Sequence, residues 1–374
     1  MGMYGQWIRR ALFGMPAEAV HAATVEACHW AGRVPGLGRV CQARFGRHYP
    51  ELASEVAGIH FPNPIGLAAG WDKNARGLPL LYQLGFGFVE IGSVSADPSQ
   101  GNPRPRLFRL PSDRGIIVNY GLPNRGAAVI ARRLARYPRP IPLGVNIVAT
   151  NRGHAAPACQ PQEILDDYAR SLKCLGPHAS YVMLNLSCPN TLDGQDFFAT
   201  TGRIRQLLQD LQHVRSSERH WQCPLFLKVP PSQRPQDHDR LLEEVADYDF
   251  VRGFMFNLAA GKPDWLQLQT PSARWRHLPG AVAGAPVATY MDACIAGLYA
   301  RMDRQRYAII GGGGVFTADD AWRKLGLGAS LIEIYTALVY EGPSLIGRLQ
   351  DGLAQRLQQH GWQRLSQAVG HLVK

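Results

Sequence analysis

Paired cysteines, long apolar runs and lysine are absent or scarce in this sequence. Its seven cysteines include no Cys-x-x-Cys pair and no neighbouring His at ligand spacing, which argues against a zinc site or a disulfide framework and for a reducing compartment. No run approaches the roughly 18 apolar residues of a membrane-spanning helix. Because Pro16 and Glu18 interrupt the only candidate signal-peptide core, a cytoplasmic protein is expected, and no metal site is predicted.

The charge of the chain is basic but dispersed. The 374 residues carry a formal net charge of +11, which would permit an acidic partner. Because the excess is spread along the chain, no nucleic-acid partner is expected. Of the 40 basic residues 34 are Arg and six are Lys, so each Lys is more informative than usual. The 46% hydrophobic content suits one large domain or two.

Residues 1–50 differ from the rest of the chain. Two amphipathic helical stretches are predicted there, the second from about Ala17 to Trp30. The apolar stripe of the first consists of Tyr4, Trp7, Ile8, Leu12 and Phe13. Six Arg oppose two Glu, a local excess of 6 − 2 = +4. This composition is typical of a helix lying in a membrane interface, and a cap packed on the main domain, residues 51–374, is the equal alternative.

From residue 65 onward, short apolar runs alternate with helical stretches. Eight strands are predicted, at 65–68, 88–94, 143–148, 181–186, 225–229, 253–257, 308–311 and 331–335. Apolar stripes at period 3.6 predict helices between them, for example over 164–175 and 204–211, and Thr317 with Asp320 marks another helix start. This alternation predicts a (β/α)8 TIM barrel with an N-terminal helical extension. A doubly wound open sheet is the alternative.

Reactive side chains gather where the predicted strands end, which is where barrel enzymes place their active sites. The most informative stretch is 181–191, in which a buried strand ends at once in polar or nucleophilic groups. These groups are Asn185, Ser187, Cys188, Asn190 and Thr191. Ordinary turns also use Ser, Asn and Pro, but a structural turn rarely needs so many reactive groups. Lys73 and Lys228 also fall at strand ends.

Glycines follow the seventh predicted strand at 311–314, and Tyr335 and Thr336 follow the eighth. Glycine lets backbone N–H groups approach a ligand closely. Loops after strands seven and eight are the recurrent phosphate site of TIM barrels. The sequence therefore predicts a phosphate-bearing ligand here.

Five segments of the chain resemble the dihydroorotate dehydrogenase family. They are 63–74 (NPIGLAAGWDKN), 84–94 (LGFGFVEIGSV), 101–110 (GNPRPRLFRL), 185–191 (NLSCPNT) and 328–338 (GASLIEIYTAL). The resemblance runs in order from about residue 50 to 360. Together with the N-terminal helical pair it is similar to the class 2 enzymes, which are membrane-associated and pass electrons to quinone. It therefore implies quinone as electron acceptor and peripheral attachment to the inner face of the cell membrane.

The resemblance also implies an FMN-dependent dehydrogenase that oxidises dihydroorotate to orotate in pyrimidine biosynthesis. Carried over where the motifs match, the residues that would hold FMN are Ala68, Ala69, Gly70, Lys73, Ser93, Asn146, Asn185, Lys228, Gly284, Gly313, Gly314, Tyr335 and Thr336. The residues that would face the substrate are Lys73, Asn185, Asn190, Thr191 and Asn257. A cation such as Lys228 near the N1/O2 edge of the flavin would stabilise the anionic reduced ring.

Cys188 stands where the family has its catalytic base, and Thr191 and Lys228 are the other catalytic candidates. Class 2 enzymes carry Ser at the position of Cys188, so here the chain resembles the soluble class 1 enzymes instead. A thiol with a reference pKa of about 8.5 is an easier base near neutrality than a hydroxyl. The alternative is a buried cysteine without a chemical role.

Four positions depart from the polar residues of the family pattern. They are Val118, which has Asn119 beside it, Phe256, Leu258 and Ala283. Each hydrogen bond lost to a charged substrate costs ~1.5–3 kcal/mol. One alternative is therefore a divergent paralogue that acts on a less polar compound, at another carbon–carbon bond beside a carbonyl. A non-catalytic, membrane-attached flavin-binding protein is the other, and the retained Cys188 and lysines speak against it.

Overall fold

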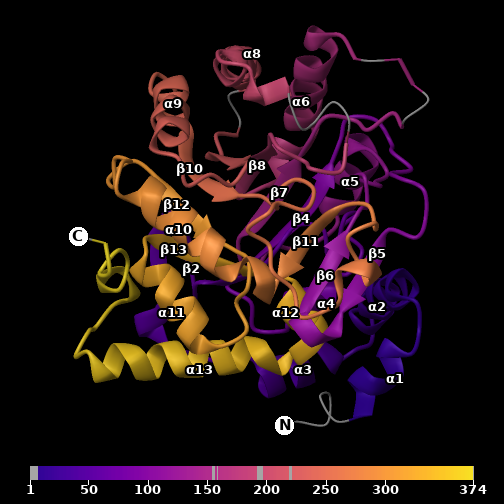
Figure 1. Cartoon of the computed structure of the whole chain (residues 1–374). Helices are drawn as coiled ribbons and strands as arrows, with labels where there is room; N and C mark the ends of the chain where they lie inside the picture. Colours follow the sequence, from indigo (N-terminus) through magenta and orange to yellow (C-terminus); the bar gives the residue numbers. More distant parts are fainter. Residues whose placement is uncertain (1–6, 154–155, 158, 192–196, 219–220, 374) are drawn as a thin grey trace.

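The centre of the molecule is a closed barrel of eight parallel strands, arranged in chain order (Figure 1). The computed structural model describes residues 7–153, 156–157, 159–191, 197–218 and 221–373. The barrel strands are β3 (Ile65–Leu67), β4 (Phe88–Val94), β7 (Leu143–Ile147), β8 (Tyr181–Asn185), β9 (Leu225–Val229), β10 (Val251–Phe256), β12 (Ala308–Gly311) and β13 (Ala329–Ile334). All eight predicted strands are confirmed, each end within two residues of its prediction. The open-sheet alternative is wrong.

The barrel follows from the apolar runs of its strands. Every residue of β4, β7, β8 and β9 is buried, because strands of a parallel barrel are covered on both faces and read as continuous apolar segments. Charged or amide groups inside such a strand, such as Glu90, Asn146 and Lys228, are therefore exceptions. They require a partner or a ligand.

Helices cover the outside of the barrel. They are α4 (Leu78–Leu81), α5 (Ala127–Leu134), α6 (Pro161–Leu175), α8 (Arg203–Ser217), α9 (Pro235–Val245), α10 (Ala288–Tyr299), α11 (Ala318–Gly326), α12 (Thr336–Glu341) and α13 (Ser344–Gln359). The predicted stripes of α6 and α8 are buried. The predicted start of α11 is confirmed, since the Thr317 hydroxyl accepts a hydrogen bond from the Asp320 backbone at 3.2 Å.

A hairpin that the sequence did not reveal closes the amino-terminal end of the barrel. Strands β1 (Ser54–Val56) and β2 (Ile59–Phe61) pair antiparallel. Val56 and Phe61 pack in one apolar cluster with aromatic rings near the starts of barrel strands. The cavity described below lies at the opposite end.

A second unpredicted sheet lies beside the carboxyl end of the barrel. It contains β5 (Leu107–Leu110), β6 (Gly115–Val118) and β11 (Ala281–Gly284), all antiparallel, with β6 in the middle. Val118 pairs with Leu107 on one side and Ala281 on the other. This three-stranded sheet forms part of the cavity wall.

The N-terminal helices pack against the barrel (Figure 1). They are α1 (Arg9–Phe13), α2 (Ala17–Ala31) and α3 (Leu37–Phe45), and α2 contacts α4 and β5. Arg106 Nε donates to Glu18 at 2.9 Å and Arg76 Nε to Glu26 at 2.9 Å, which anchors α2. Helices α1 and α2 form where amphipathic spacing predicted them, although Tyr4 lies outside the described residues, and α3 was not predicted. Within the described chain, every helix is too short or too polar to cross a membrane.

Candidate active site

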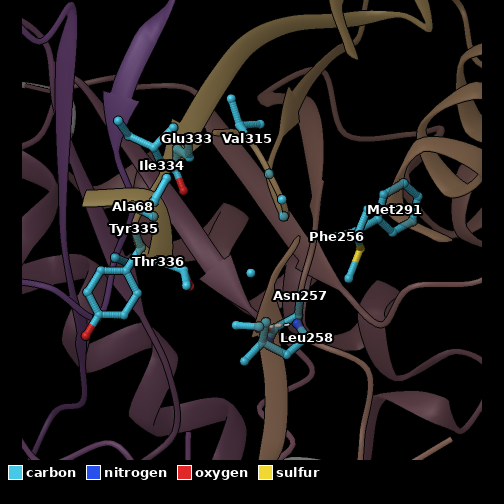
Figure 2. Close-up of a pocket in the computed structure, with 18 of the residues that line it drawn as sticks. Ala68, Phe256, Asn257, Leu258, Met291, Val315, Glu333, Ile334, Tyr335 and Thr336 are labelled. Atoms are coloured by element: carbon cyan, nitrogen blue, oxygen red, sulfur yellow. Dashed lines mark hydrogen bonds between the residues drawn. The ribbon is translucent and has the colours of Figure 1, made fainter. Parts of the chain in front are cut away.

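A cavity opens at the carboxyl ends of the barrel strands (Figure 2). Residues at or just beyond the ends of β3, β9, β10, β12 and β13 form its wall, and the three-stranded sheet adds Val118, Ala283 and Gly284. The empty space here measures about 880 Å³, with the open solvent at its mouth included. This is the end of the barrel at which catalytic groups were expected.

Most of the residues that the resemblance assigns to FMN line this cavity. Nine of the thirteen do so: Ala68, Ala69, Gly70, Lys228, Gly284, Gly313, Gly314, Tyr335 and Thr336. The other four, Lys73, Ser93, Asn146 and Asn185, are outside this lining. Lys73 and Asn185 are hydrogen-bonded to the lining residues Gly70 and Asn257, and Ser93 is bonded to Asn185. The buried Oδ1 of Asn146 has no partner within the described chain.

The glycines after β12 leave bare backbone toward the cavity. Gly313 and Gly314 have φ of +82° and +76°, and a Cβ on Gly314 would lie 2.5 Å from the Ala288 Cβ. Gly284 has φ of +103°, and a Cβ there would lie 2.8 Å from Thr336 Cγ2. Only glycine fits these positions without strain. The exposed backbone N–H groups suit the phosphate of FMN.

Lys228 brings a buried positive charge to the cavity wall. It pairs in register with Asn185 of β8 and Met255 of β10, and its residue is 9% exposed. Among the described residues no hydrogen bond holds its ammonium group. A buried cation without a bonded anion is costly, so this position fits a ligand that carries or develops negative charge.

Asn146 is a second buried polar residue with an unpaired group in the part of the chain that the structure describes. It is fully buried, and its Nδ2 donates to Glu90 Oε1 at 2.9 Å. Its Oδ1 has no partner within the described chain, and an unpaired buried acceptor costs about 1–3 kcal/mol. Nearby, Asn185 Nδ2 donates to Ser93 Oγ at 3.1 Å. These amide and hydroxyl groups match the hydrogen-bonding edge of a flavin ring, so the residues present fit FMN.

Lys73 and α2 meet at the edge of the cavity. Lys73 Nζ donates to the Gly70 carbonyl at 2.6 Å and lies 3.8 Å from the centre of the Tyr120 ring. Burial and the Arg106 charge lower the pKa of Lys73 to about 7. His21 of α2 lies beside Trp71 and Tyr335, and burial together with Lys73 lowers the pKa of His21 to about 3. Sequence reasoning missed His21, because a single His on an amphipathic helix gives no signal.

Two of the candidate substrate residues, Asn185 and Asn257, are joined directly, and Asn190 is held separately by Asn102. Asn257 Nδ2 donates to Asn185 Oδ1 at 2.9 Å and to the Ser187 carbonyl at 3.0 Å. Asn190 Oδ1 is buried and has no partner among the described residues. Asn102, which sequence reasoning missed, donates through Nδ2 to the Asn190 carbonyl at 2.9 Å. The Asn190 amide oxygen is thus a buried acceptor without a donor among the described residues.

Cys188 lies in the loop after β8, with 4% of the residue exposed, and it is not part of the cavity lining. Thr191 Oγ1 donates to the Cys188 carbonyl at 3.5 Å. Burial raises the pKa of Cys188 to about 11, although the Asn190 backbone, Thr191 and Lys228 each lower it. The effect of burial on the thiol pKa therefore outweighs that of the nearby positive charge. Without a ligand, Cys188 does not lose its proton near neutral pH as easily as the sequence analysis expected.

The positions that depart from the family pattern lie in the cavity wall. Val118, Phe256, Leu258 and Ala283 all line it, and Figure 2 shows Phe256 and Leu258 on either side of Asn257. The Asn119 side chain instead accepts a hydrogen bond from Asn102 at 3.0 Å. The apolar side chains at these positions therefore form part of the cavity wall.

A TIM barrel whose mouth combines glycine phosphate loops, a buried lysine and unpaired amide oxygens is the barrel of an FMN-dependent oxidoreductase. Comparison with known proteins specifies the family. The sequence model of the family described as dihydroorotate dehydrogenase matches residues 51–357, and the chain belongs to this family.

Individual relatives cover almost the whole chain. A protein named dihydroorotate dehydrogenase (quinone) from Mycolicibacterium smegmatis is 38% identical over 371 residues, covering 98% of this chain and 99% of its own. One of the same name from Mycobacterium tuberculosis is 36% identical over 363 residues, covering 97% of both chains. The crystal structure of DHODH from Eimeria tenella in complex with ferulenol superposes with a TM-score of 0.78 at 28% identity, covering 96% of this chain and 98% of its own.

Proposed function

We propose that this chain oxidises dihydroorotate to orotate in pyrimidine biosynthesis, with bound FMN as the first electron acceptor and a quinone as the next. The observation that carries the proposal is the cavity of a dihydroorotate dehydrogenase family member that gathers Lys228, bare glycine loops and an amide network at one barrel mouth. Relatives along the full chain length are of the quinone-linked type.

The protein residues have separable roles in this reaction. FMN, when bound, supplies the acceptor for the hydride. Lys228 holds positive charge beside the ring, and the glycine loops hold the phosphate. Asn190 and Asn257 orient the substrate through their amides. Cys188 Sγ receives the proton from the carbon next to the one that loses hydride, and Thr191 supports that loop.

The direct test is the colour of the purified protein. A yellow protein should release FMN on denaturation and bleach when dihydroorotate is added without oxygen or quinone. A colourless protein that takes up no FMN would contradict the proposal. A yellow protein that dihydroorotate leaves unbleached at every pH would keep the flavin and reject the substrate.

We also propose that residues 1–50 form a membrane- and quinone-associated segment on the FMN-binding barrel of residues 51–374. Large apolar side chains on the segment are unusually exposed. They are Trp7, Ile8, Met15, Trp30, Val34 and Val40. The segment as a whole carries six Arg against two Glu, an excess of positive charge that favours an anionic surface. Peripheral attachment to the inner face of the cell membrane accounts for both features.

Replacing two of the exposed rings tests the attachment. Trp7→Ser with Trp30→Ser should weaken sedimentation with vesicles that contain anionic lipid and slow quinone reduction, while a soluble dye still accepts electrons. Leu372→Ser is the matched control, because Leu372 is 51% exposed and distant in sequence from the segment. Equal vesicle binding by all three proteins would reject the attachment.

A second substrate class is favoured by the apolar wall. Val118, Phe256 and Leu258 line the cavity where a small polar acid would need hydrogen bonds. A divergent paralogue would oxidise or reduce a less polar compound at a carbon–carbon bond beside a carbonyl. Bleaching by such a compound, with no bleaching by dihydroorotate, would favour this second function.

A further inference from the structure

Two buried carboxyl groups lie inside the barrel near the cavity. Glu90 in β4 and Glu333 in β13 are 0% and 2% exposed, and only β3 stands between their strands. Glu333 lines the cavity, where Figure 2 labels it. Neither residue has a role in the reaction as described above.

The hydrogen bonds of the two carboxyl groups are unequal. Glu90 Oε1 accepts from Asn146 Nδ2 at 2.9 Å and Glu90 Oε2 from the Tyr181 hydroxyl at 2.9 Å, so both of its oxygens already act as acceptors. Neither oxygen of Glu333 receives a donor from the other described residues. Two neighbouring carboxyl groups can form a hydrogen bond with each other only if one of them is protonated.

The charges around Glu333 favour that proton on Glu333. Burial and the Glu90 charge raise the pKa of Glu333 well above its ordinary value, and Lys228 opposes them. The titratable groups that face it are Glu90 from β4, Lys228 from β9 and Tyr181 from β8, and the Tyr181 hydroxyl also donates to Glu90. With Glu333 neutral, Lys228 faces one fewer negative charge inside the barrel.

We propose that Glu333 carries a proton that it shares with Glu90, and that this proton leaves the positive charge of Lys228 available to the FMN ring. Glu333 is then a positioning residue for Lys228. If Glu333 were ionised, its carboxylate would compete with the ligand for Lys228 in the same cavity. Negative charge arriving on the ring would in turn favour the protonated form of Glu333, which takes its proton from solvent.

Infrared spectroscopy of the flavin-loaded protein tests the shared proton. The wild type should show the carbonyl band of one protonated carboxylic acid at pH 8 that Glu333→Gln lacks, because glutamine keeps the shape and an N–H donor but no carboxyl proton. In Glu90→Gln the same band should disappear at a lower pH than in the wild type, because the charge that retains the proton is gone. Glu163→Gln, a change of an exposed carboxylate, is the control and should keep the band. No band difference between the wild type and Glu333→Gln would overturn the proposal.

The reduction potential of the flavin tests the link to Lys228. Measured against pH, the wild type should show a change of slope where Glu333 loses its proton, and Glu333→Gln should lack it. The same profile in both proteins would overturn the link. The link between Glu333 and Lys228 rests on the proposed FMN binding. Neither the infrared nor the potential measurement uses dihydroorotate, so both can be made even if dihydroorotate is not the substrate. A colourless protein would defeat the proposed function, whereas its infrared band would still report on the proton.

Discussion

Replacement of Cys188 is the most informative single perturbation. The loop that holds Cys188 is buried, and its burial raises the thiol pKa to about 11. Because pH 8 lies about three units below this pKa, roughly one thiol in a thousand is ionised at pH 8 before ligand binds. If that thiolate is the base, the rate of flavin reduction should rise about tenfold per pH unit between pH 7 and 10.

The size of the effect follows from the role of a general base. Such a group contributes about 10²–10⁴-fold to the rate, so Cys188→Ala should slow flavin reduction by that factor and retain bound FMN. Cys188→Ser should be slow at neutral pH, with a rate that still rises at the highest pH the fold tolerates, because a hydroxyl ionises less readily than a thiol.

Cys223 offers a matched control for this experiment. It is also buried, and burial raises its pKa to about 11, but it lies beside Arg215 and Gly176 on the outer layer of the barrel. The assay is anaerobic stopped-flow bleaching of the flavin by dihydroorotate across pH. Cys223→Ala should leave the rate and its pH dependence unchanged. A wild-type rate independent of pH, or equal rates for Cys188→Ala and wild type, would refute the assignment of the base.

Three further substitutions test separate parts of the site. Lys228→Met should slow flavin reduction by about 10²–10³-fold, as loss of one positioned charge-stabilising donor does, and stopped-flow bleaching measures it; an unchanged rate would contradict its place beside the ring. Gly314→Ala should abolish stoichiometric FMN binding, since its Cβ would lie 2.5 Å from the Ala288 Cβ; flavin content per protein reports this, and full occupancy would show that the loop does not hold the phosphate. Val118→Asn should lower the KM for dihydroorotate about tenfold or more, because a hydrogen bond to a charged group contributes ~1.5–3 kcal/mol; an unchanged KM would show that this wall does not touch the substrate.

Local pattern was enough to predict the barrel strands. Each buried parallel strand is a short run of consecutive apolar residues, so it can be located from the local sequence alone. The hairpin β1–β2 was not predicted because each of its strands has only three residues. Strand β11 was not predicted because it follows a long irregular segment. Pairing between distant segments, such as Ala283 with Ile116, leaves no trace in local spacing.

The sequence predicted those parts of the site in which the residue type itself indicates the role. It did not predict properties, such as a pKa, that depend on the surrounding residues. The lysine at 228 and the glycines at 313 and 314 lie in the cavity wall because barrel architecture fixes where strands end. The raised pKa of Cys188 depends on burial by residues far along the chain. Glu333 was visible only as a charged residue within an apolar strand, a signal that gains meaning once Glu90 is seen beside it.

The three-stranded sheet has a mechanical consequence. Its outer strand β5 contacts α2, and its opposite strand β11 carries Gly284 in the cavity wall. Because the three strands are hydrogen-bonded to one another, they should move as a rigid body. A tilt imposed on α2 by a lipid surface would then displace the rim of the cavity as well. The bilayer would then act as an allosteric effector of the flavin pocket, and turnover in detergent micelles and in vesicles should differ even with the same soluble acceptor.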